Sequence, residues 1–219
     1  CNLDEGFKNY EVRKEKPLSK KKVNELIEKY SCKEWQGENL DSKTIIILSE
    51  QGLGDNIQFF RYLFWLKDKF NTNIIFLINK KISHLFKDTP FNIVSNLDNI
   101  KHIDYFKFVM SLPGMYFNQN QSFPKLVQYI KPSKEVDLIW KDRLQKFKKP
   151  VIALNWQGDR SFMFDKTRSI ALSNFKNILN LKKYAFISIQ KGFGSEQIKR
   201  NKFENYLTDL SNEIDNGNK

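Results

Sequence analysis

Apolar side chains in the first thirty residues recur every three or four positions, as on one face of a helix. This spacing holds over residues 3–13 and again over residues 18–30, where Pro17 and Ser19 suit a helix start. The following stretch, SCKEWQGENLDSK, has no such periodicity and predicts a loop. We therefore expect a short helical segment over residues 1–34.

From Thr44 the pattern changes to short, continuous apolar runs separated by amphipathic stretches. Continuous runs of this kind are typical of strands buried on both faces. Strands are predicted at 44–49, 73–78, 91–95 and 105–110, helices at 55–70, 82–86 and 136–147, and a turn at SLPGMYF. The alternation predicts a parallel sheet with helices on both faces, as a Rossmann-like domain over residues 43–148.

A second α/β unit is predicted after Lys148-Lys149-Pro150. The run VIALNW (151–156) reads as a buried strand, and a polar loop (157–168), a helix (173–181), a strand (184–189) and a helix from about Ser195 follow. About two strands are far fewer than the five or six of a complete doubly wound domain. We expect a partial Rossmann-like unit over residues 150–219 and an α/β fold class for the chain.

Charge and composition narrow the function classes. The formal net charge is +12, which favours acidic partners. However, most of the cations are scattered lysines, and arginine, which forks onto phosphates, is rare, so we expect no nucleic-acid partner. No apolar run approaches the roughly 18 residues of a membrane helix, so no membrane insertion is expected. Two cysteines suit neither a disulfide scaffold nor a zinc site, and a cytoplasmic location is expected.

The junction EQGLGDN follows the first buried strand. In open α/β folds ligands lie beyond the carboxyl ends of the strands, and Gly52 and Gly54 would let the backbone approach one. Asp55 either caps the following helix, a contribution of about 1 kcal/mol, or acts as a general base. The motif is not G-x-G-x-x-G, and no acidic residue follows the second strand, so a Rossmann NAD site is not expected.

Two further glycine-bearing junctions lie in the second unit. The stretch NWQGDRSFMFDKTRSIAL holds Gly158, Arg160, Lys166 and Arg168, which suit a diphosphate or form a solvated basic loop. The stretch SIQKGFGSEQ holds Gln190 and Lys191, which either contribute to the same phosphate site or lie in an ordinary turn. His84 and His102 read as structural, and no cluster of His, Cys and carboxylates has metal-ligand spacing.

Several of these segments carry a resemblance to a known family. WQGENL, ILSEQGLGDNIQFFRYL, SLPG, LNWQGDRSFMFDKTRSIAL and ISIQKG occur in the same order in bacterial proteins with tetratricopeptide repeats followed by a glycosyltransferase-like domain. That domain is similar to the heptosyltransferase and O-linked GlcNAc transferase group, which has the GT-B fold. The beginning, LDEGFKNYEVR, resembles the last helix of such a repeat array.

The resemblance implies an acceptor domain followed by a nucleotide-sugar donor domain, with no metal cofactor. It implies that Asp55 is the base, that Glu50, Gln51, Gln58 and Arg61 orient the acceptor or brace the loop, and that Arg168 and Lys166 meet the donor phosphates. A protein partner would bind through the repeat-like helices. The Asp-Thr-x-x-x-His segment of the family's donor domain has no match here, so we expect an incomplete donor domain.

Two functions follow as hypotheses. The first is an inverting glycosyltransferase that moves a sugar from a nucleotide sugar to a sugar or protein acceptor. In the second, a non-catalytic α/β module binds a glycan, a nucleotide or a protein.

Overall fold

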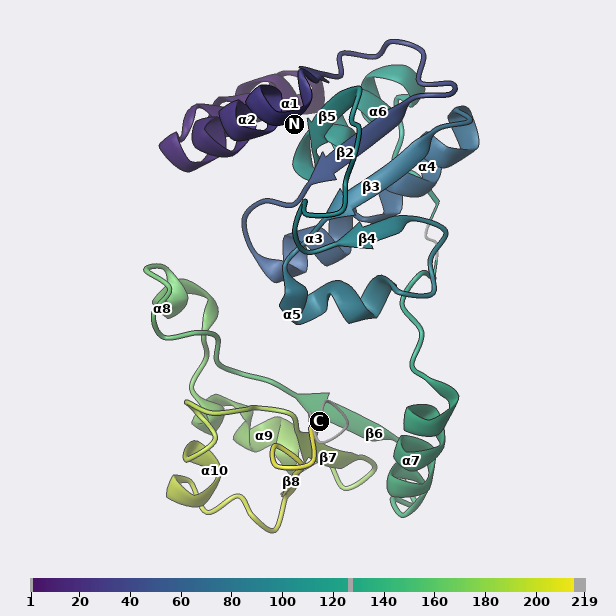
Figure 1. Cartoon of the computed structure of the whole chain (residues 1–219). Coiled ribbons are helices and arrows are strands. Elements are labelled where there is room, and N and C mark those ends of the chain that lie inside the picture. The colour runs from purple at the N-terminus through teal and green to yellow at the C-terminus, as the bar shows by residue number, and fades with distance from the viewer. Residues whose placement is uncertain (1, 126–127, 215–219) are drawn as a thin grey trace. The chain divides into compact units, whose positions relative to one another are not determined.

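The structure, a computed structural model, describes residues 2–125 and 128–214. The chain divides into two compact units, Cys1–Lys131 and Pro132–Lys219, each with its own parallel sheet (Figure 1). The α/β, Rossmann-like fold class expected from the sequence is confirmed.

The first unit is built on a five-stranded parallel sheet with the order β1-β5-β2-β3-β4. The strands are β1 (Lys33–Glu34), β2 (Thr44–Leu48), β3 (Asn73–Leu77), β4 (Asn92–Val94) and β5 (Tyr105–Phe108). After β2 the chain continues to β3 on one side, whereas β5 pairs with the other side of β2. The carboxyl ends of β2 and β5 therefore form the topological switch point, where ligands of open α/β sheets bind.

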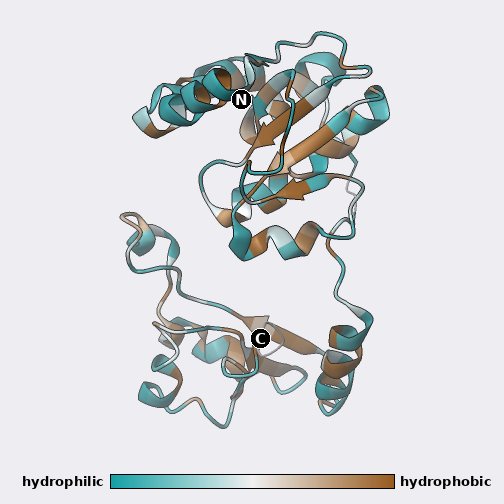
Figure 2. Cartoon of the chain, in the orientation of Figure 1, coloured by the Kyte–Doolittle hydropathy of each residue, from teal (hydrophilic) through white to brown (hydrophobic). Residues whose placement is uncertain are grey.

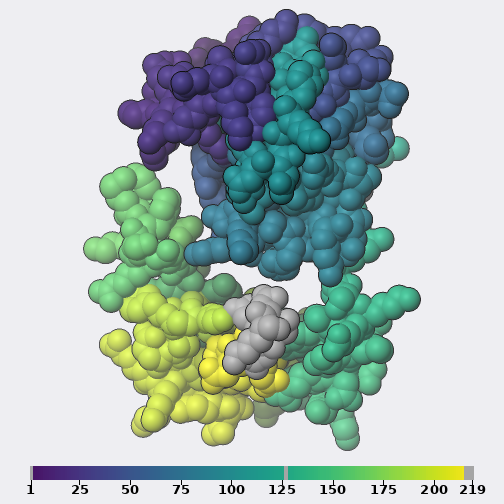
Figure 3. Space-filling model, viewed as in Figure 1, coloured from purple at the N-terminus to yellow at the C-terminus, as the bar shows by residue number. Residues whose placement is uncertain are grey.

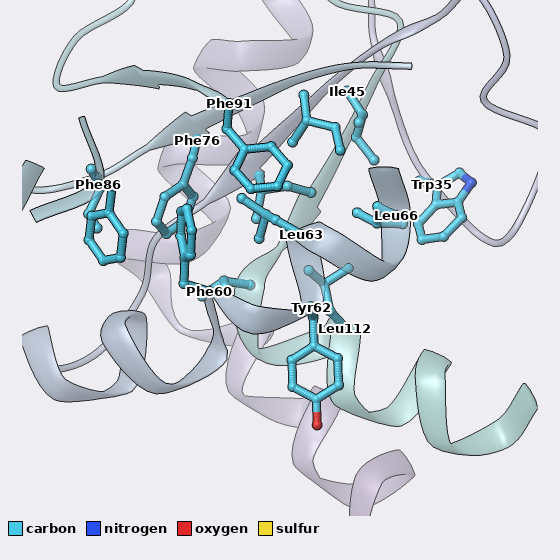
Figure 4. Close-up of a cluster of buried hydrophobic side chains, with 14 of the residues drawn as sticks. Trp35, Ile45, Phe60, Tyr62, Leu63, Leu66, Phe76, Phe86, Phe91 and Leu112 are labelled. Carbon is cyan, nitrogen blue, oxygen red and sulfur yellow. The ribbon is translucent and has the colours of Figure 1, made fainter. Parts of the chain in front are cut away.

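Alternate residues of the central strand supply two cores, one on each face of this sheet. Ile45 and Ile47 belong to the first core, together with Phe60 and Leu63. Ile46 and Leu48 belong to the second core, on the opposite face, together with Leu26. Figure 4 shows the first core, with its aromatic side chains gathered between strands and helices. The helices on that side include α3 (Leu53–Phe59), α4 (Arg61–Lys69) and α5 (Lys80–Ser83), which a 3-10 turn (His84–Phe86) extends. The central strands β2 and β3 are hydrophobic along most of their length because both faces of the sheet are covered there (Figure 2).

The N-terminal helical segment belongs to this unit. It comprises α1 (Leu3–Tyr10), the 3-10 helix η1 (Glu11–Glu15) and α2 (Pro17–Tyr30). Leu26 of α2 is buried in the second core, and α1 packs on α6 (Leu112–Asn120). In the space-filling view the segment, in purple, lies directly against the body of the sheet unit (Figure 3).

Three local predictions in this unit are wrong. SLPGMYF is not a turn, because a 3-10 turn (Val109–Ser111) leads directly into α6. Its proline is tolerated there because it lies in the first helical turn. Gly114 leaves room for Phe7, whose Cβ lies 3.0 Å from the position that a Cβ on Gly114 would take. The loop after the helical segment contains β1, which pairs with β5. The helix expected over 55–70 is two helices, which meet at the buried Phe60.

The second unit has a three-stranded parallel sheet with the order β6-β7-β8. Its elements are α7 (Lys134–Gln145), β6 (Val151–Leu154), α8 (Asp165–Arg168), the 3-10 helix η4 (Leu172–Phe175), α9 (Lys176–Leu179), β7 (Ala185–Ser188), α10 (Gln197–Arg200) and β8 (Leu207–Asp209). The sequence predicted only two strands here. β8 was missed because its three residues are too short for a periodicity, and pairing with β7 fixes it.

The boundary between the units also differs from the one expected at 148–150. It falls after Lys131, so that α7 belongs to the second unit. Arg143 of α7 forms an ion pair with Glu213 near the other end of this unit. The pair lies 70 residues apart in sequence, so no local pattern predicts it.

Candidate functional site

The loop after β2 is shaped by one buried amide, that of Asn56. Asn56 is 3% exposed; its Oδ1 accepts from the N–H of Glu50 at 3.2 Å, and its Nδ2 donates to the carbonyls of Glu50 (3.0 Å) and Gly52 (2.8 Å). Gln51 between them has φ 56°, in the left-handed region. The amide thus satisfies the backbone of a tight turn and fixes the direction in which Glu50 and Gln51 point. No pattern in the sequence distinguishes Asn56 from an ordinary helix residue, because its partners are backbone groups of the preceding loop.

Asp55 caps the helix that this loop begins. Its Oδ2 accepts from the N–H of Gly52 at 2.9 Å. A Cβ on Gly52 would lie 3.0 Å from that same oxygen, so glycine suits the position because it leaves room for the cap. The capping alternative is therefore what the geometry displays. The role of Asp55 as a base stays a prediction.

Glu50 lies at the switch point and is held by Arg13 from the helical segment. The Nε and Nη2 of Arg13 donate to the two carboxylate oxygens of Glu50 at 2.9 and 2.8 Å, and the side chains are only 6% and 9% exposed. Glu50 also accepts from the N–H of Met110, which follows β5. Arg13 further donates to Ser111 Oγ at 2.8 Å. One bidentate pair therefore joins the helical segment to both strand ends.

This pair is one end of a chain of alternating charges. Arg13 contacts Glu11 at 2.8 Å, Glu11 contacts Lys14 at 2.8 Å, and Lys14 contacts Glu34 of β1 at 2.7 Å. Glu34 then contacts Lys107 of β5, which is 4% exposed, at 2.9 Å. Three acids and three bases neutralise one another, which makes the burial of Glu50 and Lys107 tolerable.

The ion pairs shift the pKa values of two carboxyl groups that take part in them, those of Glu11 and Glu34. Burial raises the pKa of Glu11, but the hydrogen bonds and charges of Arg13 and Lys14 outweigh burial and lower it. The pKa of Glu34 is lowered in the same way, by Lys14 and Lys107 against burial. The pKa of Arg13 is raised, since Glu50 and Glu11 outweigh its desolvation. Both acids are thus stabilised in their ionised form.

The other predicted acceptor residues do not gather around Glu50. Gln51 donates to the hydroxyl of Tyr10 at 2.6 Å and so stays near the helical segment. Gln58 is exposed on α3, and its carbonyl accepts from the Nε of Arg61 at 2.8 Å. Arg61 lines a different cavity, of about 540 Å³, with Trp65. Gly54 is exposed and has open space around it.

In the second unit, Gln190 ties together the loops that follow β6 and β7. It is 3% exposed, and its Oε1 accepts from the N–H groups of Trp156 (3.1 Å) and Gln157 (2.9 Å). Its Nε2 donates to the carbonyls of Gln157 (3.1 Å) and Phe193 (2.9 Å). All four hydrogen bonds of the amide go to the backbone, so Gln190 positions these loops.

The predicted phosphate-binding residues lie on the loop after β6. Arg168 lies over Gly158, where a Cβ would come within 2.6 Å of its guanidinium, and its Nε donates to the buried Asp165 at 3.3 Å. Ser169 links the same loop, since its hydroxyl accepts from the Gly158 N–H and donates to Asp165. Lys166 is exposed. The structure therefore brings Gly158 and Arg168 together around Asp165, a residue that is not among those predicted from the sequence.

Two arginines of this unit stack on exposed aromatic rings. Arg168 lies 4.5 Å from the ring centroid of Phe162, and Arg160 lies 4.8 Å from that of Phe193. Phe162 and Phe193 are 47% and 43% exposed. Arg160 thereby links the loop after β6 to the one after β7, where Lys191 is exposed. The carboxyl edge of this sheet thus presents cations beside flat apolar surface.

The part of the chain covered by residues 2–125 and 128–214 has no group of three or more His, Cys, Asp or Glu side chains placed to hold a metal ion. Within the same residues, none of the helices has the length and apolarity needed to cross a membrane. No family model, curated protein or solved structure matches the chain.

Proposed function

We propose that the chain is a glycosyltransferase-type protein of the GT-B class, in which the first unit holds a sugar or protein acceptor and the second a nucleotide sugar. The observation that carries the proposal is that β2 of the first sheet, and the neighbouring strands β6 and β7 of the second, end in polar, glycine-bearing loops. The carboxyl ends of parallel strands are where such folds bind ligands. The sequence resemblance assigns the same loops to acceptor and donor.

The donor assignment rests on the chemistry of the loops after β6 and β7. Arg160, Lys166 and Arg168 supply positive charge for a diphosphate, and arginine meets phosphate oxygens with a planar fork. Phe162 and Phe193 are exposed aromatic rings beside these cations, and aromatic rings stack on nucleobases. A nucleoside diphosphate combines both requirements in one molecule. No metal is part of the proposal.

The acceptor assignment gives Asp55 the role of base. One of its oxygens holds the Gly52 N–H, and the other is proposed to take the proton of the acceptor hydroxyl. The hydroxyl oxygen then bonds to the anomeric carbon while the bond from that carbon to the phosphate oxygen breaks. The nucleoside diphosphate leaves with the electron pair, and Arg168 and Lys166 stabilise its charge. The anomeric configuration is inverted.

The helical segment is proposed to be the end of a tetratricopeptide-like array through which a protein partner binds. Its exposed apolar residues, Val12 (69%) and Leu18 (83%), are available for such contacts. We place the activity in the cytoplasm, since the only cysteine within the described residues, Cys32, is buried and free.

The test is sugar transfer by the Asp55→Asn variant. Release of nucleoside diphosphate is measured from UDP-, GDP- and ADP-linked hexoses, with and without a simple sugar acceptor. Asparagine retains an oxygen for the Gly52 N–H but has no basicity, so transfer is expected to fall by about 100-fold or more. The unfolding free energy should stay within about 0.5 kcal/mol, because the cap is preserved.

Retention of transfer within about threefold would remove Asp55 from the role of base. Calorimetric binding of the same nucleotides to the unchanged protein separates the two hypotheses. Saturable binding without release from any donor would contradict the transferase and leave the non-catalytic binding module. Absence of both binding and release would contradict the transferase and the nucleotide-binding form of the module.

A further inference from the structure

A groove runs along the helical segment beside the carboxyl ends of β2 and β5. It has a volume of about 650 Å³. It is lined by residues of the first unit alone: Arg13, Lys16, Pro17, Leu18, Ser19, Lys22, Ser49, Glu50, Gln51 and Phe108. Small-molecule sites have volumes of about 300–1,000 Å³ and combine an apolar lining with a few convergent polar groups. The groove has the size and composition of such a site.

The charge of the lining is unbalanced. Three cations face one carboxylate, and that carboxylate, Glu50, is already held on both oxygens by Arg13. The positive charge in excess therefore belongs to Lys16 and Lys22. The Nζ of Lys22 donates to the carbonyl of Ser49 at 3.1 Å, which places the ammonium at the end of β2.

Lys22 is partly buried. Burial lowers its pKa, against an opposing effect of the Glu50 charge. A partly desolvated ammonium that contacts a neutral carbonyl gains more from an added anion than a fully hydrated one does. The neighbouring Lys21 differs, because its side chain is 74% exposed. The two adjacent lysines of α2 thus form a natural comparison.

The apolar part of the lining comes from Pro17, Leu18 and Phe108, beside the polar Ser19, Ser49 and Gln51. Pro17 and Leu18 begin α2, and Phe108, the last residue of β5, is 2% exposed. An apolar wall beside a lysine pair matches a ligand with a negative head and a hydrocarbon or ring body. A bare inorganic ion would leave this wall in contact with water.

We propose that this groove binds a small organic oxyanion, a carboxylate or phosphate monoester on an apolar body, with Lys22 and Lys16 contacting the anionic head. The Arg13–Glu50 pair forms the floor of the site and holds its two halves together. This inference does not rest on the proposed function, because the groove excludes Asp55 and the whole second unit.

Phenyl phosphate, benzoate and the neutral phenol are the probes, titrated into the ¹⁵N-labelled full chain and followed by backbone amide shifts. Both anions should give saturable shifts confined to residues 16–22 and 49–51, and phenol should bind at least about fivefold more weakly. Lys22→Met keeps the aliphatic stem and removes the charge. It should weaken anion binding at least about fivefold, whereas Lys21→Met should change it by less than about twofold.

Equal loss in Lys22→Met and Lys21→Met would overturn the site in favour of diffuse attraction. Phenol binding as tight as the anions would leave an apolar groove without an anion site, and absence of saturation would remove the site altogether. Lys16→Gln provides a second variant in case Lys22→Met unfolds, and it should also weaken binding. A preference between phenyl phosphate and benzoate identifies the head group.

Discussion

At the scale of single residues, buried side chains near the strand ends form hydrogen bonds and ion pairs within the protein. Asn56, Arg13 and Gln190 each use their polar atoms to hold loop backbone or a neighbouring charge. Buried polar groups need such partners, because an unmatched one costs about 1–3 kcal/mol, and more if charged. The loops in which the sequence predicts functional residues are therefore held by internal hydrogen bonds and ion pairs.

Arg13 provides the sharpest residue-scale prediction. Replacing it by methionine leaves Glu50 buried without its partner, and breaking a buried pair in this way costs about 3–5 kcal/mol. We expect urea unfolding of Arg13→Met to show a loss of that order. The exposed substitution Lys21→Met is the control and should stay within about 0.5 kcal/mol. The double variant Arg13→Met/Glu50→Leu should recover most of the loss, and failure to do so would contradict the argument from an unpaired charge.

At the scale of elements, the N-terminal helical segment is part of the sheet unit. Its α2 helix covers the second face of the sheet through Leu26. Its η1 helix contributes Arg13 and Lys14 to the series of alternating ion pairs. These ion pairs connect η1 to both β1 and β5. The packing of the helical segment on the sheet thus depends on ionised carboxylates.

A pH dependence follows from the lowered pKa values of Glu11 and Glu34. Their contribution to stability is complete above the unfolded pKa and is lost as the pH falls through the lower folded pKa, since the unfolded chain then binds more protons. The urea unfolding free energy should therefore fall between about pH 5 and pH 3. The variant Glu11→Gln/Glu34→Gln should show a flatter dependence over this range. The exposed Glu25→Gln should keep the slope of the unchanged protein, and an equal flattening there would contradict the assignment.

At the scale of the whole molecule, each unit has a core of its own. The two clusters of the first unit extend no further than Ile130 among the described residues, and that of the second unit is built around Trp156, Phe186 and Leu207. Independent cores of this kind are what allow units to fold separately. The helical segment contributes to one of them.

Truncation tests this organisation. Residues 1–131 alone should unfold in one cooperative urea transition, because their sheet and both its cores are complete. Residues 35–131 should lose that transition, since Leu26 and Cys32 leave the second core and Glu50 loses Arg13. Circular dichroism during the titration is the measurement. A shorter fragment as stable as the longer one would show that the helical segment is only an appendage.

The sequence by itself determined the local features of this protein. Buried strands and their following helices were predictable because burial on both faces requires continuous apolar runs, as in β2 and β3. The cap formed by Asp55 was predictable as one alternative because it spans three residues. These signals are short-range, and they give the α/β class without the partners of the charged residues.

Only the tertiary structure decided which distant side chains meet. Arg13 and Glu50 are 37 residues apart, and Lys107 and Glu34 are 73 apart. The strand pattern does not predict a buried lysine in β5. Glu50 is expected from the sequence to orient an acceptor or brace the loop, and only the fold shows that Arg13 is its partner. The physical reason is that a charge can be buried wherever an opposite charge is brought close. That proximity is a property of the fold, whereas periodicity reports only whether a position is buried.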